Sequence, residues 1–128
     1  MELKINVIKR ETGVYHVVLA GPLDSDTYNV LEEKVNSLLT EDTKAIFLNM
    51  GGVNYISSMG LGAIFKIAQG LKRVNGQLAI TNLQPQIKKV FDTVKAFPQA
   101  LFKDIAEADA YLDQIQRDVF EKDKPSSL

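Results

Sequence analysis

Residues 45–71, AIFLNMGGVNYISSMGLGAIFKIAQGL, decide the fold of this chain. They begin with the unbroken apolar run Ala45-Ile46-Phe47-Leu48, which is typical of a strand buried on both faces of a central sheet. The strand is expected to end at Asn49, and Gly51-Gly52 loosens the loop after it. From Ser58 onward apolar residues recur at helical spacing, which predicts a helix. The apolar stripe of that helix consists of Leu61, Ile64, Phe65, Ala68 and Leu71.

The sequence before this stretch predicts a β-hairpin and a first helix. Apolar residues alternate with others over residues 3–7 and again over residues 14–19, and the turn signal Glu11-Thr12-Gly13 separates the two runs. Gly21-Pro22 breaks the second strand, and Asp24 or Ser25 can then cap a helix. The expected apolar face of this helix is Tyr28, Leu31, Val35 and Leu38.

The sequence after the central helix predicts further strands and helices. Asn75-Gly76 ends the central helix, residues 77–80 form a short strand, and Pro85 fits the first turn of a third helix. Leu101-Phe102 could form a last edge strand. A final helix opens at Asp104, with Glu107 at capping-box spacing. The third helix is expected to bury Ile87, Val90, Phe91 and Val94, and the final helix Ala108, Tyr111, Leu112 and Ile115.

Together these elements predict an α/β fold with a mixed sheet of four to five strands, an N-terminal β-hairpin and about four covering helices. The sheet is mixed because strand–helix–strand crossovers require parallel neighbours, whereas the hairpin is antiparallel. The apolar signal fades near Gln116. We therefore expect one domain over residues 1–116 and a polar, flexible tail over residues 117–128.

The composition argues against several kinds of site. The chain has 128 residues and is 45% hydrophobic, which is enough for a core without metal or disulfide support. It has no cysteine, and its single histidine, His16, lies in an alternating strand pattern where a half-exposed structural role is expected. The sequence therefore predicts no metal, no cofactor and no catalytic residue.

Charge and hydropathy bear on partners and location. The formal net charge is −1, with basic and acidic residues mixed, so no nucleic-acid partner is expected. The first residues lack the pattern of a signal peptide, and no apolar run approaches the roughly 18 residues that a spanning helix needs. We expect a cytoplasmic protein without membrane insertion.

Several segments resemble one family of bacterial regulators. Residues 46–62, which include Ser57-Ser58-Met59-Gly60-Leu61-Gly62, are similar to the signature of STAS domains (sulphate transporter and anti-sigma factor antagonist). In that signature a strand leads through an acidic-Ser-Ser/Thr-Gly-Leu-Gly turn into a helix. The resemblance extends, in order, over roughly residues 3 to 115. Its other blocks are Gly21-Pro22-Leu23-Asp24, residues 75–78 and residues 85–91.

The resemblance implies a protein-binding module and not an enzyme. Free-standing members are bacterial anti-anti-sigma factors, in which the serine after the acidic residue is phosphorylated by an anti-sigma factor kinase. That serine corresponds to Ser58, and Ser57 is the second candidate. The implied function is transcription regulation by an anti-sigma factor antagonist, a monomer or weak dimer. It would bind an anti-sigma factor of the ATP-dependent serine kinase type and release a sigma factor.

The partner-binding residues implied by the resemblance lie on and beside this turn: Asp24, Ser57, Ser58, Met59, Gly60, Leu61 and Gly62. A phosphate at a helix N-terminus is tolerated by the fold, because it meets unpaired N–H groups and the positive end of the helix dipole. A partner packed on the same turn would face an added charge. Gly60 and Gly62 would admit a partner's backbone or permit helix–sheet packing. Asp24 would line the same surface or cap a helix, and Met59 would contact a partner or be partly buried.

Three departures from the family pattern keep an alternative open. Ser57 replaces the acidic residue, Met59 replaces the small residue after the switch serine, and Asn49 replaces an aspartate. The alternative is a STAS interaction module in another regulatory or transport complex, without phosphorylation. An enzyme is not predicted, because Ser58 has no histidine placed near it and the Gly60–Gly62 segment matches neither a dinucleotide fingerprint nor a P-loop.

Overall fold

The computed structural model describes residues 2–96 and 105–123. Its four strands are β1 (Lys4–Glu11), β2 (Val14–Ala20), β3 (Ala45–Gly52) and β4 (Gln77–Thr81). Its four helices are α1 (Tyr28–Asn36), α2 (Ser58–Arg73), α3 (Pro85–Ala96) and α4 (Ile105–Asp123). The expected Leu101-Phe102 strand and the Asp104 cap lie outside the described residues.

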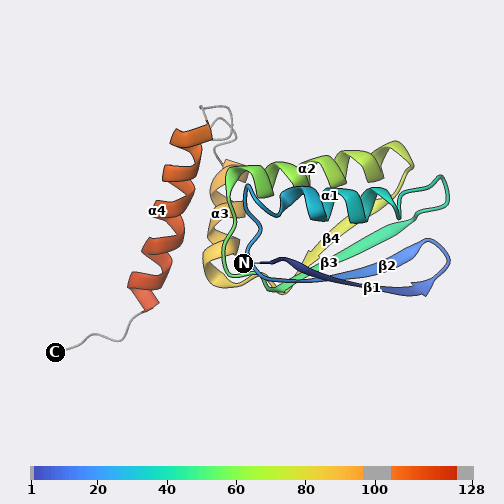
Figure 1. The fold of residues 1–128 in the computed structure, drawn as a ribbon, viewed down its shortest axis with the longest axis horizontal. Coiled ribbons are helices and arrows are strands. Elements are labelled where there is room, and N and C mark those ends of the chain that lie inside the picture. The colour runs from blue at the N-terminus through green and yellow to red at the C-terminus, as the bar shows by residue number, and fades with distance from the viewer. Residues whose placement is uncertain (1, 97–104, 124–128) are drawn as a thin grey trace.

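The strands form one mixed sheet in the order β1-β2-β3-β4. β1 and β2 pair antiparallel as the predicted hairpin, and β2–β3 and β3–β4 pair parallel across helical connections. The predicted mixed sheet with an N-terminal hairpin is confirmed. In Figure 1, α1 and α2 lie side by side over one face of the sheet, α3 stands at its end, and α4 stands beside α3.

The hydrophobic core fills the space between this face of the sheet and the helices. Every second residue of a strand points into it, as the strand geometry requires. The largest fully buried side chains come from most of the elements and from the loops beside them. They are Leu19, Leu23, Leu31, Ile46, Leu48, Met50, Ile56, Leu61, Ile64, Leu71, Ile87 and Leu112.

The prediction that β3 is buried on both faces is wrong. Ile46, Leu48 and Met50 are buried, but Phe47 is half-exposed because no described helix covers the second face of the sheet. Phe47 stacks there on His16, with ring centroids 4.7 Å apart. His16 is half-exposed on β2, as predicted. The expected loop at Gly51-Gly52 is also wrong, since β3 continues through Gly52.

The helices differ from the sequence expectations in their ends and in their buried faces. In α2, Phe65 and Ala68 of the predicted apolar stripe are exposed. The N-cap of α1 is Thr27 and not Asp24 or Ser25, because a turn over residues 24–27 precedes the helix. In α4, Tyr111 is 40% exposed and is not a core residue. The helix also continues past residue 116 to Asp123, where Gln114 bonds to Asp118 and Arg117 bonds to Gln114 on its exposed side.

Candidate functional site

The turn before α2 is held as an extended segment against the loop that follows β2. The Leu23 N–H donates to the Tyr55 carbonyl at 2.9 Å, and the Ser57 N–H donates to the Leu23 carbonyl at 3.0 Å. These bonds flank an isolated parallel bridge between Leu23 and Ile56. Two segments of the family resemblance, around residues 23 and 56, therefore lie side by side and fix where α2 begins.

Ser57 is the N-cap of α2. Its backbone is extended, with φ −100° and ψ 175°, and its Oγ accepts a hydrogen bond from the Gly60 N–H at 3.2 Å. Its carbonyl accepts the first helical bond from Leu61 at 2.9 Å. The residue is only 3% exposed, so its hydroxyl faces the helix and offers almost no surface to a kinase or a partner.

Ser58 is the first residue of α2 and is half-buried at the end of the helix. Its Oγ donates to Asp109 Oδ1 at 2.7 Å, and its N–H donates to the same oxygen at 2.9 Å. A carboxylate from α4 thus satisfies one of the N–H groups that a helix N-terminus leaves unpaired. Charge-assisted bonds of this kind are about twice as strong as neutral ones.

The two glycines of the turn have different surroundings. A Cβ at Gly60 would lie 2.4 Å from the Leu23 carbonyl oxygen, so this position admits only hydrogen. A Cβ at Gly62 would meet no heavy atom within 4 Å. Gly60 is therefore required for packing of α2 on the Leu23 segment. Gly62 has no side chain, so the backbone of α2 is accessible at that position.

The remaining predicted contact residues divide into exposed and buried ones. Met59 and Gly62 are half-exposed like Ser58, whereas Leu61 is fully buried in the core. Of the predicted turn, only Ser58, Met59 and Gly62 offer surface. Ser57, Gly60 and Leu61 are buried and hold the turn in place.

Asp24 lies in the loop before α1 and is half-buried. Its Oδ1 accepts hydrogen bonds from the Asp26 N–H at 2.9 Å and from the Thr27 N–H at 3.2 Å. It therefore stabilises the turn that leads into α1, without being the N-cap. The carboxylate is also close enough to Tyr55 to raise the pKa of that phenol, so it lies toward the segment before α2.

Three polar residues of α4 contact the turn, and the sequence interpretation missed them. They are Asp109, Asp113 and Gln116, spaced so that they share one helix face. Gln116 is buried, and its side-chain amide binds both backbone groups of Ile56: Oε1 accepts from the N–H at 3.0 Å and Nε2 donates to the carbonyl at 2.8 Å. A polar stripe beside the apolar stripe of α4 was the available signal.

Tyr55 connects the same stripe to the loop before α2. Its hydroxyl donates to Asp113 Oδ1. Burial, followed by this hydrogen bond and the charges of Asp113, Asp109 and Asp24, raises the pKa of Tyr55 well above its ordinary value. The phenol therefore stays protonated and remains a donor at neutral pH. Three carboxylates gather around this end of α2.

Replacing Gln116 should destabilise the protein measurably. In Gln116→Ala the Ile56 N–H and carbonyl lose their partners while buried, so we expect the free energy of unfolding to fall by about 2 kcal/mol. Gln114→Ala, on the exposed side of the same helix, should change it by less than about 0.5 kcal/mol. Urea denaturation of both variants measures the difference. Equal effects would mean that the Ile56 contacts contribute nothing.

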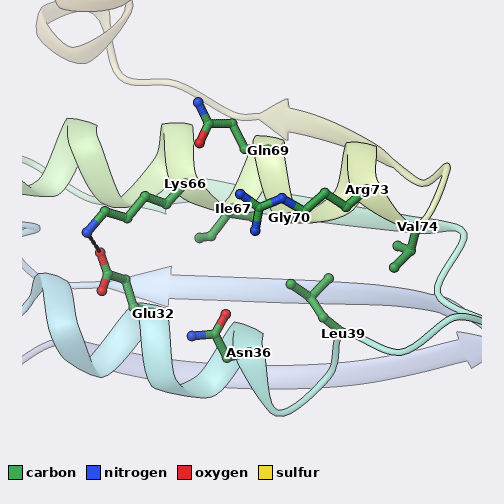
Figure 2. A pocket seen from close by; sticks show the side chains of 9 residues that line it. All are labelled: Glu32, Asn36, Leu39, Lys66, Ile67, Gln69, Gly70, Arg73 and Val74. Atoms are coloured by element: carbon green, nitrogen blue, oxygen red, sulfur yellow. Dashed lines mark ion pairs between the residues drawn. The ribbon is translucent and has the colours of Figure 1, made fainter.

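A separate groove of about 510 Å³ lies between α1 and α2, away from the turn. Figure 2 shows Lys66 of α2 reaching toward Glu32 of α1, with a Nζ–Oε1 distance of 3.5 Å. Arg73 and Gln69 line it from the α2 side, and Asn36 from the α1 side. Lys66 is exposed and Glu32 is half-buried, and ion pairs at a protein surface contribute at most about 1 kcal/mol. The groove has the chemistry of a solvated helix–helix surface.

Residues 2–96 and 105–123 contain neither a membrane-spanning helix nor a metal-binding cluster. Within these ranges, none of the helices combines the length and apolar character needed to cross a membrane. The same ranges contain no cluster of three or more His, Cys, Asp or Glu side chains arranged to hold a metal ion.

Comparisons with known proteins agree on one family. The STAS domain model matches residues 6–108. The anti-sigma-B factor antagonist of Staphylococcus epidermidis is 30% identical over 92 residues, covering 72% of this chain and 84% of the relative. The BtrV protein of Bordetella bronchiseptica is 28% identical over 99 residues, covering 75% of this chain and 85% of that protein.

The solved structures agree on the fold. The Bacillus cell fate determinant SpoIIAA, in its phosphorylated form, matches with a TM-score of 0.61 at 20% identity, covering 74% of this chain and 86% of that chain. At this identity the likeness concerns the fold alone. With the family model covering most of the sequence, the chain belongs to the STAS domain family.

Proposed function

We propose that this protein is an anti-sigma factor antagonist that binds an anti-sigma factor of the serine kinase type and is regulated by phosphorylation of Ser58. Binding would free a sigma factor, and the protein would act in the cytoplasm as a monomer or weak dimer. The relative from Staphylococcus epidermidis is named an anti-sigma-B factor antagonist, and SpoIIAA is described as an anti-sigma factor antagonist. SpoIIAA is also known in a phosphorylated form.

The observation that carries this proposal is the position of Ser58. Its hydroxyl lies at the first residue of α2, half-buried at the surface, beside Met59 and Gly62. Met59 offers a flexible apolar contact, and the bare helix surface at Gly62 lets another protein approach closely. Asp24 adds a carboxylate from the neighbouring loop.

A phosphate at Ser58 would act on the partner more than on the core. It adds about −1.5 to −2 charge at neutral pH. The positive end of the α2 dipole and its N–H groups favour that charge, so the domain should remain folded. A partner seated on Met59 and Gly62 would have to bury or repel a strongly hydrated anion, and its affinity should fall.

Phosphate transfer tests the proposed regulation. The chain is incubated with Mg²⁺, ATP and the kinase-type anti-sigma factor of its own organism, and its intact mass is measured. We expect a gain of one phosphate in the wild type and in Ser25→Ala, which removes an exposed serine outside the turn. Ser58→Ala should gain none.

The other outcomes contradict the regulation and favour a different role. A mass gain that survives Ser58→Ala would place the modified residue elsewhere. No gain at all would favour a STAS interaction module in another regulatory or transport complex, without phosphorylation.

A further inference from the structure

We infer that the polar contacts of α4 hold it against residues 55–58, an arrangement that we call the latch, and that a phosphate on Ser58 releases it. The inference rests on the proposed phosphorylation of Ser58 and adds its structural consequence. It starts from one contact: Asp109 Oδ1 accepts both the Oγ–H of Ser58 at 2.7 Å and the Ser58 N–H at 2.9 Å. The carboxylate of α4 therefore occupies the anion position at the N-terminus of α2.

Phosphorylation would remove each part of this contact. The Ser58 oxygen, once esterified, has no proton to donate to Asp109. The phosphate oxygens compete for the same N–H group, because a helix N-terminus favours the larger negative charge. Two anions would then face each other at hydrogen-bonding distance, and none of the described ion pairs brings a cation to Asp109.

The other polar contacts of α4 lie close to this site of repulsion. Tyr55 donates to Asp113, and Gln116 bonds both backbone groups of Ile56. Asp113 adds a second carboxylate one helical turn from Asp109, on the same face. The contacts of Asp109, Asp113 and Gln116 all end on residues 55–58. Displacement of Asp109 would therefore weaken the neighbouring contacts of Asp113 and Gln116 as well.

The apolar anchoring of α4 against the turn is modest. Ala108 and Leu112 are buried on its inner face and Ile115 packs against the core, but Tyr111 and Phe120 are exposed by 40% and 52%. Segments held by few buried side chains open more easily than the global fold unfolds. Release would expose the inner face of α4 together with the Ile56 backbone, and this surface would distinguish the two phosphorylation states.

Amide hydrogen exchange followed by NMR tests the latch without any kinase. The chain is compared with Ser58→Asp, Asp109→Asn, the double variant, and Thr12→Asp, which places the same charge in the exposed β1–β2 turn. The reporter is the Ile56 amide, which Gln116 protects, and the β3 amides report global stability.

We expect Ser58→Asp to speed exchange at Ile56 by about ten-fold or more, because two carboxylates a few ångström apart repel each other. Exchange in β3 should change far less. Asp109→Asn should leave Ile56 protected, since an amide oxygen still accepts from Ser58. The double variant should recover most of the protection, because the repulsion is gone. Thr12→Asp should behave as the wild type.

Three results would overturn the latch. The first is unchanged exchange at Ile56 in Ser58→Asp. The second is an equal acceleration in β3, which would mean global destabilisation. The third is a failure of Asp109→Asn to restore protection in the double variant. Failure of phosphate transfer would instead remove the proposed regulation and leave this charge coupling standing, so the two failures are distinguishable.

Discussion

Gly60→Ala should lower the free energy of unfolding by about 2–3 kcal/mol, even though alanine is the better helix former by about 1 kcal/mol. The added Cβ would lie 2.4 Å from the Leu23 carbonyl oxygen and 2.9 Å from the Leu23 carbonyl carbon. Both are backbone atoms of a segment that hydrogen-bonds to Tyr55 and Ser57, so no side-chain rotation can relieve the overlap. The start of α2 must move away from the loop.

Gly62→Ala is the matched control. The new methyl group would meet no heavy atom within 4 Å, and the position lies inside α2, so stability should rise by about 0.5–1 kcal/mol. Thermal or urea unfolding of the two variants measures the contrast. Similar changes in both would show that the close approach of α2 to Leu23 does not constrain the fold.

Ser58→Asp should weaken binding of the anti-sigma factor by about 100-fold, or ~2.7 kcal/mol. The carboxylate would lie at the first residue of α2, between the half-exposed Met59 and Gly62 and the three carboxylates around Tyr55. A partner that packs on this surface would bury an unpaired charge. The sheet and α2 should remain folded, because the helix dipole favours an anion at this end.

Isothermal titration calorimetry with the purified anti-sigma factor measures this effect. Thr12→Asp is the control, since it adds the same charge at an exposed turn between β1 and β2. It should bind as the wild type. Equal affinities of Ser58→Asp and Thr12→Asp would place the partner's contact surface away from the turn.

Local sequence patterns predicted most of the backbone. The alternating runs of the hairpin, the start of a helix at Ser58 and the Asn75-Gly76 stop each reflect a period or a turn preference that acts over a few residues. Asn75 indeed has φ 60°, a conformation that asparagine adopts more readily than most residues. These preferences depend only on neighbouring residues, so they can be recognised in the sequence without knowledge of the tertiary structure.

Local sequence patterns did not predict burial correctly where it depends on segments distant in the sequence. The run at residues 45–48 suggested burial on both faces, but whether a helix covers the second face depends on the whole chain, and Phe47 is half-exposed. The helical periodicity of α4 was visible in the sequence, but Tyr111 was predicted to be buried and is exposed. Local sequence does not tell which polar face of a helix meets which loop.

The candidate site was predicted by position but not by surroundings. Ser58 at the start of α2 follows from the family resemblance, and the structure places it there. The second candidate, Ser57, is a buried cap. Asp109 is separated from Ser58 by 51 positions, so its contact with the hydroxyl could not be read from either local pattern. A carboxylate of α4 thus contacts the Ser58 hydroxyl, whereas the preceding position, 57, carries a serine.

Release of a sigma factor tests the proposed antagonist function. A purified complex of the anti-sigma factor and its sigma factor is mixed with increasing amounts of this protein and separated by size-exclusion chromatography. We expect the wild type and Thr12→Asp to displace free sigma factor and to elute with the anti-sigma factor, whereas Ser58→Asp should leave the complex intact. Sigma factor that stays bound in the presence of excess wild-type protein would contradict the antagonist function.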